Sequence, residues 1–174
     1  MDRSRIAADL EDARRDLHAL LAAATPEELR RISNGTRWTN EQLLFHMVFG
    51  FLIVRRLLPL VRFVFRLPAP AGRAFAGLLD AGTRPFHTVN YLGSCGGALV
   101  YDRTRMGRLC DHTIAVLCRR LEVEPERGLH RVMPFPTRWD PYFTATMTLE
   151  DVYAYPVLHY RHHRAQLTLD RVDG

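Results

Sequence analysis

Two histidines one helical turn apart near the C-terminus are the residues best suited to metal chemistry. His159 and His163 lie in the run HYRHH, within a stretch that reads as a helix. Residues at i and i+4 share one face of a helix, so both imidazoles can bind the same ion. His162, three residues after His159, pairs with it almost as well. The spacing therefore predicts two ligands of a divalent metal, with His159 and His163 preferred.

A third imidazole lies far upstream, inside another apolar stretch. His46 is part of the sequence LLFHMV, and a bundle of helices could bring it next to the pair near the C-terminus. Catalytic zinc sites commonly have three protein ligands and one open position for water or substrate. The sequence contains neither HExxH nor any ExxH, which excludes the zinc-protease motif and the carboxylate-bridged di-iron bundle.

Four long helical segments are expected to position these histidines. Residues 3–24 repeat apolar side chains at helical spacing, and a second segment begins after Thr39, which forms a capping box with Gln42. A third runs from about residue 102 to 121, and a fourth begins at Thr148 with acidic residues in its first turn. No strand has a convincing period of two. The pattern predicts an all-α fold, a four-helix bundle in one domain over residues 1–174.

A long connection joins the second and third of these segments. It runs from Pro68 to Gly97, is rich in Pro, Gly, Ala and Asn, and could contain a short helix over residues 71–79. Loops of this length are often functional lids, and a flexible linker is the other interpretation.

The apolar stretch over residues 45–67 raises the question of a membrane span. Four arginines interrupt it, and Pro59 would kink or end a helix there. Because arginine is costly in the middle of a bilayer, we expect no membrane insertion. A buried helix, or an apolar surface shared between two subunits of a homodimer, is the favoured interpretation.

Composition limits the remaining classes of function. The 174 residues are 47% hydrophobic and 25% charged, which suits one globular domain with its own core. Three cysteines without a CxxC pair, and a first segment with no signal-peptide core, point to a reducing cytoplasm. The net charge is +5, but the basic residues are scattered and no nucleic-acid signature is present, so nucleic-acid binding is not expected. All 24 basic residues are arginine, a bias typical of GC-rich genomes.

Several of these motifs together resemble the DinB/YfiT-like family of metal-binding four-helix bundles. They are Trp38-Thr39, His46, His159, His163 and the following Arg164-Ala165-Gln166-Leu167. The resemblance covers about residues 8 to 170, and the connection over residues 68–97 is its least family-like part. It implies a site of three histidines, His46, His159 and His163, holding zinc or nickel, in a protein that often forms homodimers.

The resemblance also implies a class of reaction. Relatives include S-transferases that use bacillithiol or mycothiol, and the mycothiol-dependent maleylpyruvate isomerase. We therefore expect a metal-dependent transferase in which a small thiol attacks an electrophile, with mycothiol the first thiol to consider given the GC-rich bias. A metal-binding bundle that acts as a hydrolase or a sensor, and an interaction protein with incidental histidines, remain as alternatives.

Three further residues are expected to contact the substrate. Arg164 could bind a carboxylate of the thiol or the substrate, although a solvated helix arginine is the other interpretation. Trp139, on the loop that leads to the last helix, could line the mouth of the pocket or cover the core. Tyr160 could donate a hydrogen bond to a ligand.

Overall fold

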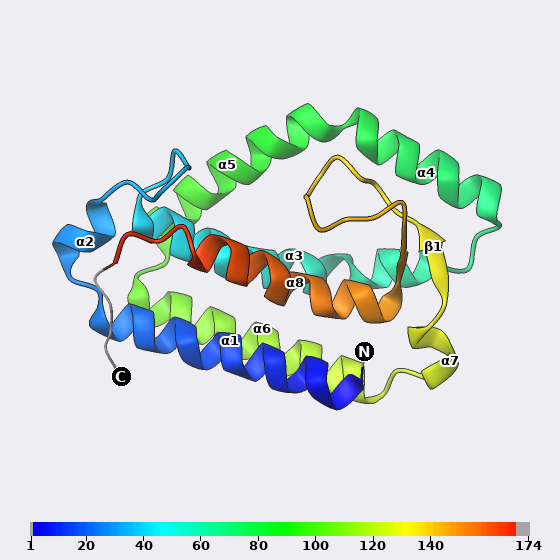
Figure 1. Cartoon of the computed structure of the whole chain (residues 1–174), viewed down its shortest axis with the longest axis horizontal. Helices are drawn as coiled ribbons and strands as arrows, with labels where there is room; N and C mark the ends of the chain where they lie inside the picture. Colours follow the sequence, from blue (N-terminus) through cyan, green and yellow to red (C-terminus); the bar gives the residue numbers. More distant parts are fainter. Residues whose placement is uncertain (1, 170–174) are drawn as a thin grey trace.

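The structure, a computed structural model, describes residues 2–169 and confirms the all-α fold. Four long helices form the bundle: α1 (Arg3–Ala23), α3 (Asn40–Val64), α6 (Arg103–Glu122) and α8 (Leu149–Arg164). The helices α1 and α6 pack against each other, α3 packs against both α6 and α8, and α1 also contacts α8. Figure 1 shows α3 and α8 across the middle of the molecule, with α4 and α5 arching over them. The two helices expected to carry the histidines are therefore neighbours.

Capping boxes set the beginning of the helices that carry the histidines. The Thr39 hydroxyl accepts a hydrogen bond from the Gln42 backbone N–H, and Gln42 Oε1 accepts one from the Thr39 N–H at 3.1 Å. At the start of α8, Thr148 and Asp151 form the same reciprocal pair. A third box, at Thr25, begins the short helix α2 (Pro26–Arg30). Such caps satisfy the free N–H groups of a first turn, so these positions are determined locally.

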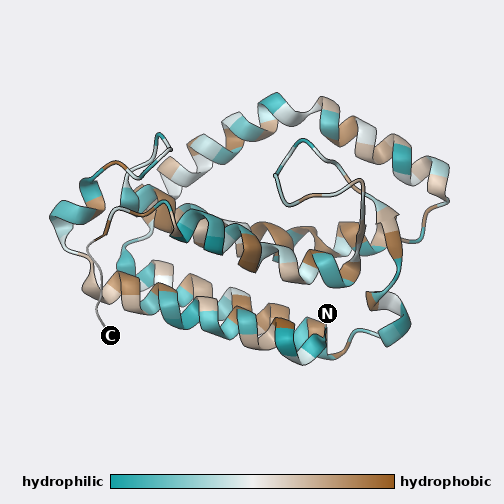
Figure 2. Cartoon of the chain, in the orientation of Figure 1, coloured by the Kyte–Doolittle hydropathy of each residue, from teal (hydrophilic) through white to brown (hydrophobic). Residues whose placement is uncertain are grey.

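The helix α3 is the central helix of the fold. Among the described helices it alone is long and apolar enough to cross a membrane by length and composition, and 50% of its most apolar window is buried in the protein. It contacts α5, α6 and α8, and Figure 2 shows apolar residues along these facing helices. Pro59 lies inside α3, which continues to Val64, so the helix does not end at the proline.

The long connection between α3 and α6 consists of two helices. The short helix expected over residues 71–79 lies within α4 (Ala69–Ala81), but the glycine-rich run near residue 95 is also helical, as part of α5 (Thr83–Val100). Gly97 explains the difference: a Cβ atom there would lie 2.0 Å from Cε1 of Phe45. The glycine thus allows the α5 backbone to pack directly on α3, and this contact compensates for a weak intrinsic helix propensity.

A small antiparallel sheet, which the sequence did not predict, lies beside the start of α8. After the short helix α7 (Glu126–Leu129), β1 (Val132–Pro134) pairs with β2 (Thr146–Thr148), with Met133 opposite Met147. Strands of three residues are too short to show a period of two. The loop between them, residues 135–145, lies between the α4–α5 arch and α8 in Figure 1. The sheet anchors both ends of this loop beside α8.

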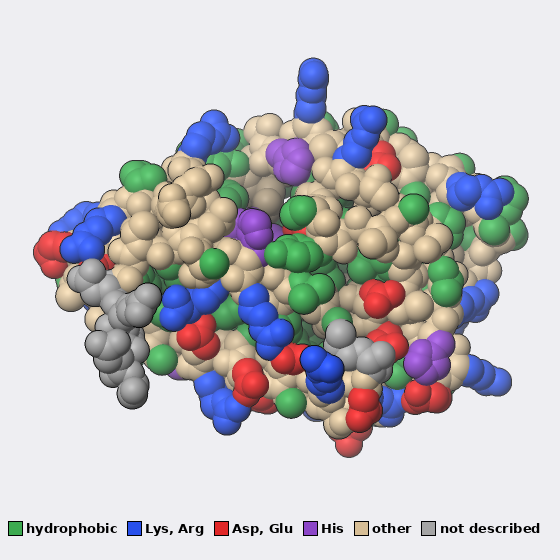
Figure 3. Space-filling view, viewed as in Figure 1, with side chains coloured by type: hydrophobic (Ala, Val, Ile, Leu, Met, Phe, Trp, Pro, Cys, Tyr) green, Lys and Arg blue, Asp and Glu red, His purple; other side chains and the backbone are tan. Residues whose placement is uncertain are grey.

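Charged side chains are interspersed on the surface. On the face shown in Figure 3, arginines are spread over its whole width, with acidic side chains among them. Many of these charges are paired, for example Arg14 with Asp111 at 3.2 Å and Arg164 with Asp16 at 3.0 Å. The net positive charge is therefore distributed over this face of the molecule.

Candidate metal centre

Three imidazole rings meet between α3 and α8. His46 comes from α3, and His159 and His163 come from consecutive turns of α8. Nε2 of His46 lies 3.1 Å from Nε2 of His159 and 3.2 Å from Nε2 of His163. Nitrogen ligands of a tetrahedral zinc ion, with bonds of about 2.0–2.1 Å, lie about 3.3 Å apart. Both distances from His46 thus nearly match this spacing, and the ligand atoms of all three histidines lie within 4.8 Å of one another.

An aspartate fixes the orientation of the His159 ring. Nδ1 of His159 lies 2.9 Å from Oδ2 of Asp140, which also accepts a hydrogen bond from the Tyr155 hydroxyl at 2.9 Å. Oδ1 of the same carboxylate accepts from the Tyr142 backbone N–H at 2.9 Å. Both carboxylate oxygens are therefore occupied by donors. A metal-ligating imidazole almost always donates its other ring N–H to a carboxylate, a backbone carbonyl or a water, and such a contact fixes the orientation of the ring.

The other two rings also have acceptors behind them. His46 Nδ1 lies 3.0 Å from the Ser94 hydroxyl on α5, which itself donates to the Asn90 carbonyl at 2.8 Å. The Ser94 oxygen is thus left to accept a hydrogen bond from His46. His163 Nδ1 lies 2.7 Å from Oε1 of Gln166, one turn further along the chain. Each ring therefore donates its Nδ1–H outward.

The outward hydrogen bonds determine what the three rings present to the centre. A neutral imidazole with its proton on Nδ1 carries a lone pair on Nε2. Three such lone pairs directed at one point repel one another unless a cation lies between them. The arrangement therefore fits a divalent ion held by three neutral imidazoles, a ligand type that suits zinc, nickel, copper and iron.

Burial favours the neutral form of two of the three imidazoles. Burial, together with the neighbouring His159 and His163 rings, lowers the pKa of His46 well below its ordinary value. Burial and the His159 ring likewise lower the pKa of His163 to about 4, although its hydrogen bond to Gln166 opposes the shift. Burial alone would raise the pKa of Asp140, but hydrogen bonds, above all from His159, lower it. Near neutral pH His46 and His163 are thus ready to bind a cation without first losing a proton.

Aromatic side chains enclose one side of the centre. The Trp38 ring stacks on His46 with ring centroids 4.4 Å apart, and Tyr91 of α5 stacks beyond it at 5.8 Å. On the α3 side, a Cβ atom on Gly50 would lie 2.8 Å from Cδ2 of His159. A glycine at position 50 therefore makes room for the His159 ring against α3.

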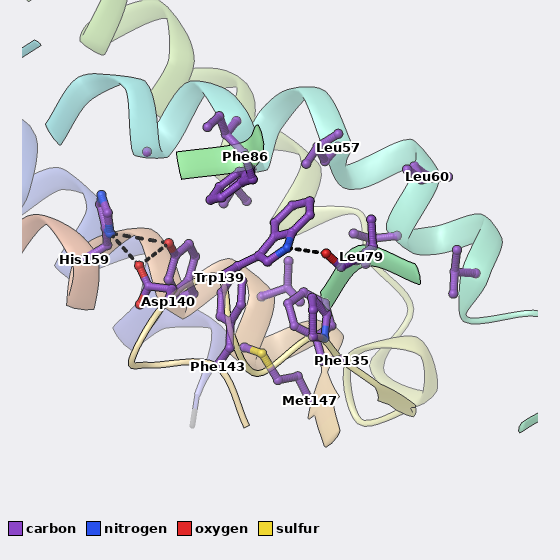
Figure 4. A pocket seen from close by; sticks show the side chains of 18 of the residues that line it. Leu57, Leu60, Leu79, Phe86, Phe135, Trp139, Asp140, Phe143, Met147 and His159 are labelled. Atoms are coloured by element: carbon purple, nitrogen blue, oxygen red, sulfur yellow. Dashed lines mark hydrogen bonds and ion pairs between the residues drawn. The ribbon is translucent and has the colours of Figure 1, made fainter. Parts of the chain in front are cut away.

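A cavity adjoins the three histidines. It has a volume of about 210 Å³ and lies between α3, the α4–α5 arch, the loop over residues 135–145 and α8. His46, His159 and Asp140 form part of its wall. Figure 4 shows His159 and Asp140 at one end, Leu60 toward the other, and Trp139 between them. A molecule in the cavity would lie directly beside the metal ligands.

Comparison with protein families decides the relationship of this chain. A family model described as the DinB superfamily matches residues 9–167. The chain belongs to the DinB superfamily. Neither the curated proteins nor the solved structures compared with it include a match.

The residues that the sequence suggested for this DinB superfamily member lie in two different places. The three histidines lie together, and Trp139 lines the cavity, where its indole stacks on Phe86 with centroids 4.0 Å apart. Arg164 and Tyr160 both contact Asp16 of α1 instead, and neither lines the cavity.

The adjacent His162 is exposed and lies outside the three-histidine cluster of this DinB superfamily member. Its Nδ1 lies 3.3 Å from the Tyr142 hydroxyl. The structure therefore favours His163 over His162 as the second candidate ligand of α8, a choice that the spacing left open.

Sequence reasoning missed the residues behind the ligands. Asp140 is 19 residues from His159 and Ser94 is 48 residues from His46, so no local spacing relates either pair. The contact of His163 with Gln166 was missed as well, although only three residues separate the two in the chain. In this DinB superfamily member, the outer contacts depend mostly on how loops and α5 pack against the bundle.

Proposed function

We propose that this protein is a metal-dependent transferase. His46, His159 and His163 hold a divalent ion, zinc or nickel, and a low-molecular-weight thiol such as mycothiol or bacillithiol attacks an electrophilic substrate. The convergence of three Nε2 atoms, each with its Nδ1–H donated outward, carries this proposal. An ion held by these three histidines would supply Lewis acidity, which would lower the pKa of a bound thiol well below its free value of about 8.5.

The overall reaction is a substitution that needs no oxidant. A thiol RSH and an electrophile R′X give the thioether RSR′ and HX: one C–S bond forms, the C–X bond breaks, and X leaves with the bonding electron pair. Three protein ligands leave a coordination position open, which a transferase of this kind requires. Membership in the DinB superfamily supports the metal site, and the thiol chemistry is our proposal.

Asp140 acts as a positioning residue. It is the single carboxylate among the described residues that line the cavity, and its two oxygens already accept hydrogen bonds from His159, Tyr155 and the Tyr142 N–H. A carboxylate with all these donors is poorly placed to take up another proton. Its role is to hold His159 in one orientation, and the thiol proton passes to solvent.

The tyrosine beside Asp140 remains protonated. Burial, followed by the negative charge of Asp140 and their hydrogen bond, raises the pKa of Tyr155 well above its ordinary value. Tyr155 therefore donates its hydroxyl hydrogen to Asp140 across the physiological pH range. The pair forms a fixed support for the ligand rather than a proton relay.

Metal analysis of purified variants tests the ligand set. The wild-type protein should contain about one divalent ion per chain, and His46→Ala, His159→Ala and His163→Ala should each lose it. His162→Ala is the matched control, since it lies in the same helix but outside the cluster, and it should retain the metal. Stoichiometric metal in the His46→Ala protein would exclude the proposed site.

Activity assays test the thiol chemistry. The metal-loaded protein should catalyse conjugation of mycothiol or bacillithiol with a chlorodinitrobenzene or bimane electrophile, and the thiol should raise its melting temperature. A protein that binds metal but shows neither effect is not a thiol transferase of this type. Hydrolysis of ester substrates by that protein would then favour the hydrolase alternative.

We also propose that the protein is a cytoplasmic homodimer. Three free thiols suit a reducing compartment. The C-terminal half of α3 exposes Leu57, Leu60 and Phe63, at 39%, 43% and 59%, and these side chains are suited to a contact with a second subunit. Light scattering that gives the mass of a single subunit would refute the dimer.

A further inference from the structure

We propose that the cavity beside the three histidines binds an uncharged apolar group, an alkyl chain or an aromatic ring. It would hold the body of the electrophile and place its polar, reacting end at His46 and His159. That the bound group belongs to a substrate rests on the proposed function. The binding itself follows from the cavity and needs neither metal nor thiol.

The lining of the cavity is strongly asymmetric. Its polar side chains belong to the histidine end: His46 and His159 are ligands, Tyr155 and Asp140 contact His159, and Asn90 lies one turn before the serine that contacts His46. The rest of the wall comes from aliphatic and aromatic side chains and from proline and glycine, with Leu60, Val64 and Phe75 among them. A ligand would therefore have one polar end and an apolar body.

The charges around the cavity select against ionic ligands. Among the described residues, its wall contains no arginine, so a ligand carboxylate placed away from the metal would be buried without a counter-ion. Burying an unpaired charge is far more costly than burying an uncharged group. The ionised Asp140 would also repel an anion, and it offers little to a cation because its oxygens already accept three hydrogen bonds. A dicarboxylate such as maleylpyruvate could place one carboxylate at the metal but would bury the other without a partner, so it is a poor fit.

The volume sets the size of the ligand. A dry engineered cavity of about 150 Å³ is large enough to bind benzene. By that comparison, the cavity of about 210 Å³ found here holds roughly eight to ten non-hydrogen atoms. This corresponds to a medium-length alkyl chain or a substituted aromatic ring.

The wall that covers the cavity is held at several points. The Trp139 indole N–H donates to the Leu79 carbonyl of α4 at 2.7 Å, and its ring stacks on Phe86 of α5. The neighbouring Asp140 forms a hydrogen bond with His159. Because consecutive residues of one loop contact the arch and the metal ligand, the loop joins the apolar wall to the metal centre.

Calorimetric titration of the metal-free protein with 1-alkanols and the matching alkanoates tests the proposal. Alkanol affinity should rise about fourfold for each added CH₂, as expected when each buried CH₂ contributes about 0.8 kcal/mol, and should level off near eight to ten non-hydrogen atoms. Alkanoates of equal length should bind at least about tenfold more weakly. Equal affinity for both series, or no dependence on chain length, would overturn the proposal.

Two variants with a matched control place the binding in this cavity. Ile53→Trp puts an indole into the lining and should abolish alkanol binding, whereas Leu78→Trp adds the same side chain at an exposed position of α4 outside the lining and should leave the binding unchanged. Should Ile53→Trp fail to fold by circular dichroism, Leu57→Ala replaces it: this widens the cavity and should move the plateau to longer alkanols. Binding that responds to none of these lining changes refutes the assignment.

The outcomes separate this inference from the proposed function. Alkanol binding without metal or transferase activity would leave the cavity assignment intact and reject the transferase. Transferase activity without selective alkanol binding would reject the cavity assignment and leave the metal chemistry intact.

Discussion

Replacing Asp140 tests whether the hydrogen bonds behind the ligands prepare the site for metal. Asp140 contacts no metal position itself, but Oδ2 accepts the Nδ1–H of His159 at 2.9 Å. Asp140→Asn keeps an acceptor oxygen and removes the negative charge, whereas Asp140→Ala removes both. Both variants should fold and bind zinc more weakly than the wild-type protein, and Asp140→Ala should bind it more weakly than Asp140→Asn.

The magnitude follows from the contacts of the carboxylate. Loss of an outer hydrogen-bond partner typically lowers metal affinity by about 10–100-fold. The side chains of Asp140 and His159 are each about 10% exposed, so water does not readily replace the lost contact. We expect Asp140→Asn to weaken zinc about 10-fold, near 1.4 kcal/mol, and Asp140→Ala about 100-fold.

Competition with a chromophoric zinc chelator measures these affinities. Asp80→Asn is the matched control, because Asp80 Oδ1 accepts the Arg138 N–H at 3.1 Å and so anchors the same loop without touching a histidine. It should leave zinc affinity unchanged. An Asp140→Ala protein with wild-type affinity would refute the reasoning, and equal losses in the Asp80 and Asp140 variants would assign the effect to the loop and not to His159.

Three further predictions concern packing and protonation. Gly97→Ala places a Cβ against Phe45 and should lower the free energy of unfolding by about 1–3 kcal/mol and the melting temperature by about 2–10 °C. Gly96→Ala is the control: a Cβ there meets nothing within 4 Å, so the melting temperature should stay the same or rise. In the metal-free protein the pKa of His163 is about 4, below its value of about 6.5 in an unfolded chain. The unfolded state therefore binds the extra proton first, and the free energy of unfolding in urea should fall by up to about 3 kcal/mol between pH 6.5 and 4; stability that rises over this range would contradict the assignment. Burial raises the pKa of Cys110 to about 12. Iodoacetamide should therefore not modify this thiol in the native protein at pH 8 and should modify it after unfolding in urea, as measured by mass spectrometry.

Local rules account for the parts of the site that the sequence predicted. Thr39 and Thr148 begin α3 and α8 because each forms a reciprocal pair with a residue three positions later. Once α8 begins at residue 149, helical geometry alone places His159 and His163 on one face.

Packing decides the features that local rules miss. Helix α5 continues through a glycine-rich run because Gly97 lets its backbone rest on Phe45, a contact between distant segments. That helix in turn brings Ser94 to His46. Intrinsic propensity favours a break at this run, and tertiary contact overrides it.

The sequence by itself determined where α3 and α8 begin, the paired imidazoles of α8 and the family-level expectation of a third at His46, because capping and helical spacing act within a few residues. The tertiary structure decided how closely the three rings meet, which of their nitrogens faces the centre, and what lies beside them. Those features depend on Asp140, Ser94 and the wall of the cavity, which come from segments far apart in the chain. Hydrogen bonds and van der Waals contacts act only over short distances, so such a site exists only once the fold has brought these segments together.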